Sequence, residues 1–120
     1  MSEDRRRSVR VTERLVVFLK HPATGKVHRG LTNNISSIGV CVVTEQFFNP
    51  GAPLEVEIKL PDREAPVTFT GVVVWSRVAE EAQKVYEGPT VELGIKFVQI
   101  DPRDLALIQQ HAAMNAPPPG

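Results

Sequence analysis

The stretch Leu54-Glu55-Val56-Glu57-Ile58-Lys59-Leu60 alternates apolar and charged side chains at every position. Successive side chains of a β-strand point to opposite faces, so this alternation predicts a strand with one buried face and one face in water. The segment from Val91 to Phe97 shows the same period, with apolar side chains at Val91, Leu93, Ile95 and Phe97. Both segments therefore predict strands that pack one face against a core.

Four more strands are predicted on either side of the first stretch. They cover Leu15 to Leu19, Lys26 to Thr32, Gly39 to Thr44, and Val67 to about Val78. Residues with turn chemistry separate them: Pro22-Ala23-Thr24-Gly25, the Asn-x-Ser loop after residue 32, Asn49-Pro50-Gly51 and Pro61 to Pro66. A charged loop is predicted from Ala79 to Thr90.

The end of the chain changes from a strand period to a helix period. Asp101 can cap free amides at a helix start, and Pro102 suits the first helical position. Leu105, Ile108 and Ala112 then share one face of a helix that runs to roughly Ala113. Six short strands and one terminal helix predict a mainly β fold, a six-stranded antiparallel β-barrel with a C-terminal helix that plugs one end or packs on the outside.

Length and composition define the general class. A chain of 120 residues with 42% hydrophobic and 23% charged residues is one globular domain. No apolar stretch approaches the roughly 20 residues of a membrane span, and the chain begins with charges instead of a signal-peptide apolar run. We expect a cytoplasmic protein with no membrane partner. The single cysteine, Cys41, lies in an apolar run and is expected to be a buried, inert thiol.

Charge is balanced overall, with 14 basic and 14 acidic residues, but it is uneven along the chain. Five arginines crowd the first 14 residues: Arg5, Arg6, Arg7, Arg10 and Arg14. A local basic patch on a neutral body suits a small anion better than a nucleic acid polymer, which needs an extended basic stripe.

The sequence contains no constellation typical of an enzyme or a metal site. His21, His28 and His111 lack metal-ligand spacing and are predicted to be surface residues. Ser36 and Ser37 have no nucleophile elbow around them, and no glycine-rich phosphate loop occurs. We therefore expect a protein that is not an enzyme and holds no metal or cofactor.

Two short motifs indicate a site for a guanine nucleotide. Arg6 and Arg10 form an Arg-x-x-x-Arg pair, preceded by Arg5, and guanidinium groups bind phosphates, stack on bases and pair with the O6/N7 edge of guanine. The second motif is an Asn-x-Ser-x-x-Gly loop made by Asn34, Ser36 and Gly39. Asn and Ser offer donors and acceptors, and Gly permits an unusual φ and a close approach of the ligand or the arm.

The two motifs, in this order and within a predicted barrel, resemble those of the PilZ domain, the bacterial receptor module for cyclic di-GMP. Gly71-Val72-Val73-Val74-Trp75 and Gly94-Ile95-Lys96-Phe97 extend the resemblance over nearly the whole chain. Asn34 replaces the commoner Asp of the family motif. The resemblance implies cyclic di-GMP as ligand, with both motifs contacting it. It also places an aromatic residue, here Trp75, near the ligand, although Trp75 is equally compatible with a core position.

The resemblance also bears on stoichiometry, because the position before the arginine pair is the one that separates one bound nucleotide from two. Arg5 occupies it, so two intercalated nucleotides per chain are predicted. Arg7 and Arg14 are expected to face solvent.

We divide the chain into a flexible arm (1–12), a barrel with its helix (13–113) and a disordered tail (114–120). The function expected is that of a stand-alone receptor, monomeric or weakly dimeric, that signals to a protein partner when ligand orders the arm. One alternative is a ligand-independent adaptor whose arginines meet an acidic partner. Another is a barrel that binds RNA or single-stranded DNA, but no pair of exposed stacking aromatics is visible. The partner and the regulated process, motility among the options, are not readable from sequence.

Overall fold

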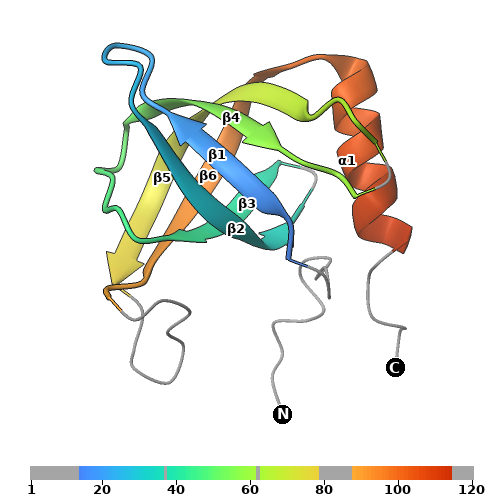
Figure 1. The fold of residues 1–120 in the computed structure, drawn as a ribbon. Helices are drawn as coiled ribbons and strands as arrows, with labels where there is room; N and C mark the ends of the chain where they lie inside the picture. The colour runs from blue at the N-terminus through green and yellow to red at the C-terminus, as the bar shows by residue number, and fades with distance from the viewer. Residues whose placement is uncertain (1–13, 37, 62, 79–87, 115–120) are drawn as a thin grey trace.

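The computed structural model of the chain describes residues 14–36, 38–61, 63–78 and 88–114. They form a closed barrel of six antiparallel strands in the order β1-β2-β3-β6-β5-β4, followed by one helix (Figure 1). The elements are β1 (Val16–Lys20), β2 (Val27–Ile35), β3 (Gly39–Thr44), β4 (Pro53–Ile58), β5 (Val67–Val78), β6 (Val91–Ile100) and α1 (Pro102–Met114). The predicted fold class is confirmed.

The barrel encloses the side chains that the alternating pattern predicted to be buried. In β4, Leu54, Val56 and Ile58 are buried while Glu55 is exposed. They join one cluster with apolar residues of the other strands, among them Val17, Leu19, Val42, Val67, Leu93 and Ile95. Burying each such side chain contributes about 1.5–3 kcal/mol. This core fixes which face of each strand points outward.

The helix closes one end of the barrel. The Asp101 Oδ1 atom accepts a hydrogen bond from the Arg103 amide at 2.8 Å, which is the N-cap that the sequence predicted. Ile108 is fully buried, and α1 packs against β2 and β5, which lie on opposite sides of the ring. A helix that touches both lies across the opening, so of the two predicted positions it takes that of a plug. In the part of the chain described, no helix is long and apolar enough to cross a bilayer.

Two strands run further than their local sequence indicated. β2 continues to Ile35, so Asn34 lies in a strand and not in the predicted loop. It does so because Asn34 and Ile35 pair with Cys41 and Val40 of β3, after an irregularity between Thr32 and Asn34. β6 likewise continues beyond Phe97 to Ile100, where it pairs with β5.

Candidate functional site

The strand registers bring four residues together in one row on the outer face of the barrel. Asn34 pairs with Cys41, Cys41 pairs with Gly94, and Gly94 pairs with Trp75. Directly paired residues of antiparallel strands point to the same face. Since the neighbouring residues Ile35, Val40, Val42, Leu93 and Ile95 are in the core, this row faces outward. We call it the Asn34–Trp75 row.

Trp75 ends this row as an outward-facing aromatic that is 41% exposed. Its indole lies directly on Gly94, because a Cβ added at Gly94 would overlap the indole atoms Nε1 and Cε2. A register shift between Val73 and Trp75 lets the strand present the ring to this side. Of the two options from the sequence, the core position is wrong: the Trp75 ring contacts Gly94 through its Nε1 side, and Trp75 remains 41% exposed.

The turn after β2 is closed by Ser36. Its amide donates to the Gly39 carbonyl at 2.9 Å, and its Oγ donates to the same oxygen at 3.2 Å. The Ile38 amide donates to Ser36 Oγ at 3.3 Å. Ser36 therefore holds the turn against the start of β3, and its hydroxyl keeps one further acceptor position.

Gly39 is needed for a different reason from the predicted unusual φ. Within the described residues, positive φ occurs at Gly25 and Gly51, so the expected strain at Gly39 is wrong. Instead, a Cβ at Gly39 would overlap the backbone carbonyl oxygen of Ile95 in β6. The glycine of the motif thus permits close contact between β3 and β6.

Cys41 lies in the middle of the Asn34–Trp75 row. It is half-buried and faces outward, which corrects the expectation of a fully buried thiol. Burial raises the pKa of the Cys41 thiol, and a long contact from Asn33 Nδ2 to Sγ at 4.0 Å partly opposes this rise. The charge of Glu92 adds to this rise in the Cys41 pKa, whereas the charges of Arg77 and Arg14 oppose it.

An ion pair lies beside the row and was not singled out from the sequence. Arg77 Nε donates to Glu92 Oε1 at 2.6 Å, and Arg77 Nη2 makes an ion-pair contact with the same oxygen, also at 2.6 Å. The Glu92 side chain is only 8% exposed, whereas that of Arg77 is 62% exposed. The sequence did contain a signal for this pair. Arg77 is two residues after Trp75, and Glu92 is two residues before Gly94. Residues two apart on a strand point to the same face, so Arg77 and Glu92 lie on the face of the row.

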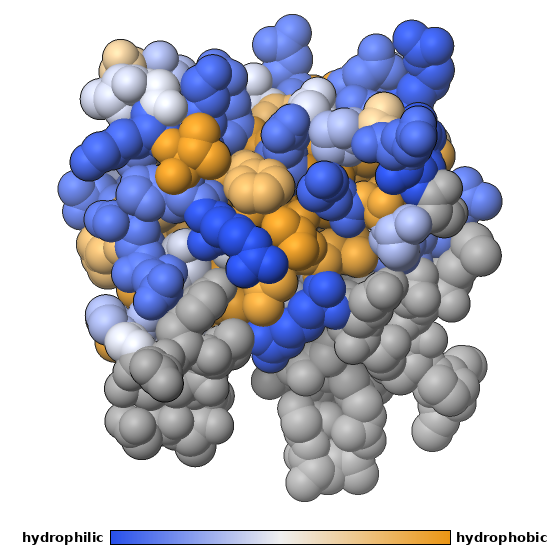
Figure 2. Space-filling model, in the orientation of Figure 1, coloured by the Kyte–Doolittle hydropathy of each residue, from blue (hydrophilic) through white to orange (hydrophobic). Residues whose placement is uncertain are grey.

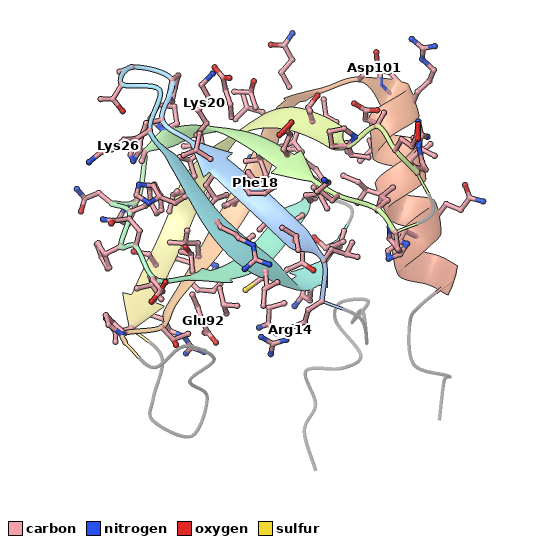
Figure 3. All side chains as sticks on the ribbon, viewed as in Figure 1. Arg14, Phe18, Lys20, Lys26, Glu92 and Asp101 are labelled. Atoms are coloured by element: carbon pink, nitrogen blue, oxygen red, sulfur yellow. The ribbon has the colours of Figure 1, made fainter. Side chains whose placement is uncertain are left out.

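The chain enters the barrel next to this site. The Leu15 amide donates to Thr32 Oγ1 at 2.9 Å, and Arg14 is exposed as expected, near the lower edge of the barrel together with Glu92 (Figure 3). The predicted site residues Arg5, Arg6 and Arg10, and Arg7, lie outside the described residues. Arg10 precedes Arg14 by four residues, a span of at most about 14 Å when extended.

The three histidines, which were predicted to be surface residues, are partly exposed. The rings of His21 and His28 lie 5.8 Å apart, and both pack on Phe48, at 5.0 and 5.6 Å. Burial, then the charges of His21 and Lys26, lower the pKa of His28. Among the described residues, no group of three or more side chains could hold a metal ion.

A groove of about 480 Å³ lies on the other side of the barrel, over β1, β4 and the start of β5. Phe18 and Lys20 line it together with Glu55, Glu57 and Asp101. Figure 2 shows this face, where apolar side chains emerge among hydrophilic ones, and Figure 3 labels Phe18 and Lys20 on it. None of the described motif residues lines this groove, so it is separate from the Asn34–Trp75 row.

Comparison with known proteins identifies the family. The model of the PilZ domain matches residues 4–113, so the chain belongs to the PilZ family. The match includes both sequence motifs and the whole barrel.

Solved structures share the fold at low sequence identity. The PilZ domain of Escherichia coli YcgR, solved with c-di-GMP, has a TM-score of 0.68 and 14% identity over 92% of this chain and 91% of that chain. Bacillus subtilis MotI, an inhibitor of motility, has a TM-score of 0.67 and 24% identity over 92% of this chain. K. pneumonia MrkH in its apo state has a TM-score of 0.72 and 16% identity over 96% of this chain. This chain spans about half the length of MotI and MrkH, 50% and 52% respectively. The search of curated proteins found no match.

Proposed function

We propose that this protein is a receptor for cyclic di-GMP, which it binds on the outer face of the barrel along the Asn34–Trp75 row. The observation that carries the proposal is the register that gathers Asn34 and Trp75 onto one face, beside the point where the arginine-bearing segment joins the barrel. The PilZ domain of YcgR, which has the same fold, was solved with c-di-GMP.

The chemistry of the row suits the two halves of this ligand. The Asn34 amide can donate to or accept from a guanine edge, and the exposed part of the Trp75 ring can stack on a base. The arginines Arg5, Arg6 and Arg10 supply charged hydrogen bonds to the phosphates. Ser36 and Gly39 hold the turn and the β3–β6 contact beside Asn34, and the Ser36 hydroxyl retains an acceptor for the ligand.

We further propose that the ligand acts by fixing the N-terminal arm (1–12) on the barrel. A segment with several like charges and few apolar residues gains order when phosphates neutralise its arginines. The newly covered surface is what a protein partner reads. In this proposal the receptor is not an enzyme, works in the cytoplasm as a monomer or weak dimer, and binds two intercalated nucleotides because of Arg5.

Calorimetric titration tests the binding step. The purified chain is titrated with cyclic di-GMP, with GMP and with a short single-stranded oligonucleotide. Saturable binding of cyclic di-GMP alone supports the receptor. Binding of none of the three contradicts it and favours the ligand-independent adaptor, and preference for the oligonucleotide favours the nucleic-acid-binding barrel.

A further inference from the structure

The Arg77–Glu92 pair is unusual for an ion pair on the outside of a barrel, because its carboxylate is almost fully buried while its guanidinium is largely exposed. We propose that Arg77 recognises a guanine of the ligand by its O6/N7 edge and that Glu92 is the positioning residue that holds Arg77 for this contact. This inference rests on the proposed function and adds the residue that selects the base.

The donors of Arg77 divide into a used edge and a free edge. A guanidinium has five N–H donors in a rigid plane. The Nε donor is hydrogen-bonded to Glu92 Oε1 at 2.6 Å, and Nη2 lies 2.6 Å from the same oxygen in the ion pair. Among the described residues, these contacts use the Nε side of the group and leave the end of the fork, with both Nη1 donors and the second Nη2 donor, available. Two parallel donors at the end of an arginine match the O6 and N7 acceptors of guanine, whereas adenine presents a donor in place of O6.

Arg77 lies beside the place that a base stacked on Trp75 would take. Arg77 follows Trp75 by two residues on the same strand, and both pair with outward-facing positions of β6, Glu92 and Gly94. The Cα atoms of Trp75 and Arg77, two residues apart on one strand, are about 7 Å apart. A purine that stacks on the exposed part of the Trp75 ring therefore has an edge directed along β5 within reach of the Arg77 fork.

Glu92 explains how an exposed arginine can be specific. A free arginine side chain has many rotamers, and fixing one on binding costs entropy. The short contacts to a buried carboxylate restrict that freedom before the ligand arrives, and the strand register places both residues beside Trp75 and Gly94 of the row. Loss of the Glu92 charge should therefore weaken recognition of guanine even though Glu92 itself does not touch the base.

The test compares cyclic di-GMP with cyclic di-AMP by calorimetry for wild type, Arg77→Lys and Glu92→Gln, with a thermal melt of each variant. Lysine keeps the charge but lacks the fork. We expect Arg77→Lys to lose about 5- to 150-fold in affinity for cyclic di-GMP, while affinity for cyclic di-AMP stays unchanged. Glu92→Gln should lower the ratio of the two affinities by a smaller factor.

Matched controls come from the opposite side of the barrel. Lys20 and Glu55 form a weaker surface pair at 4.0 Å, so Lys20→Gln and Glu55→Gln should leave both affinities unchanged. If either variant at the site fails to fold, the double variant Arg77→Gln, Glu92→Gln removes both charges together and should show the same loss of guanine preference.

The outcomes separate this inference from the function on which it rests. Wild type that does not bind cyclic di-GMP contradicts the receptor itself. Wild type that binds, with folded Arg77→Lys or double variants that keep the same guanine preference, overturns the role of Arg77 alone. A Glu92→Gln variant with wild-type affinities overturns the positioning role of Glu92.

Discussion

Gly39→Ala is expected to destabilise the barrel strongly for so small a change. The added Cβ would overlap the Ile95 carbonyl and lie 3.0 Å from Lys96 Cα, and both are backbone atoms of the paired strand β6. Neither can rotate away, so β3 and β6 must separate at this point. The separation also weakens the hydrogen bond from the Phe97 amide to the Ile38 carbonyl, which is 3.0 Å long.

The size of this effect follows from two contributions. Overpacking costs about 1–3 kcal/mol, and loss of one backbone hydrogen bond adds about 0.5–1.5 kcal/mol. We therefore expect the free energy of unfolding to fall by about 1.5–4.5 kcal/mol. For a domain of this length, about 4 °C of melting temperature corresponds to 1 kcal/mol, which predicts a drop of about 6–18 °C.

Thermal unfolding followed by circular dichroism measures this drop, with Gly88→Ala as the matched control. Among the described residues, a Cβ at Gly88 meets only the side chain of Glu45, at 3.7 Å, so the control should melt close to wild type. Gly39→Ala that melts with wild type would refute the argument and return the motif glycine to a role in ligand contact.

Four other predictions concern the ligand and pH. Trp75→Ala should weaken cyclic di-GMP binding by about 5- to 150-fold in calorimetry, because one base loses its stacking partner; unchanged affinity would remove Trp75 from the site. Arg6→Ala and Arg10→Ala should each cost about one to two decades in affinity without altering the melt, since charged hydrogen bonds contribute about 1.5–3 kcal/mol; wild-type affinity in both would sink the arginine motif as a binding element. Arg5→Leu should reduce the stoichiometry from two nucleotides towards one, and a wild-type ratio of one, with active protein concentration verified, would contradict this. Burial and the charges of His21 and Lys26 lower the pKa of His28, so the unfolded chain binds the proton more readily. The neutral His28 side chain therefore contributes to the stability of the fold above pH 6.5, and this contribution is lost as the pH falls below 6.5. His28→Gln should flatten the fall in melting temperature between about pH 7 and pH 5, and an equal fall in both proteins would argue against this cause.

The strands and the helix were readable from local sequence because their causes are local. The alternation from Leu54 to Leu60 predicts which side chains of β4 are buried, and they are. The Asp101-Pro102 pair predicts the start of α1, and the cap is formed. These features depend on side-chain period and on free backbone amides, which neighbouring residues determine.

Strand ends and the environment of single residues were less accessible. Asn34 has a low preference for strands, yet pairing with Cys41 extends β2 through it. Cys41 reads as buried from its apolar neighbours, but its alternating position turns it outward, to the face that Asn34 and Gly94 share. Tertiary pairing overrides local preference at both positions.

For the candidate site, too, some features follow from local sequence and others from the tertiary structure. The sequence by itself determined the fold class and the two motifs, with Asn34, Ser36 and Gly39 as residues of interest. Only the tertiary structure decided that Asn34 and Trp75 lie in one row, that the indole rests on Gly94, and that Arg77 is held by a buried Glu92. The physical reason is that hydrogen-bond register between strands distant in sequence depends on how the whole barrel closes, and no local pattern specifies it.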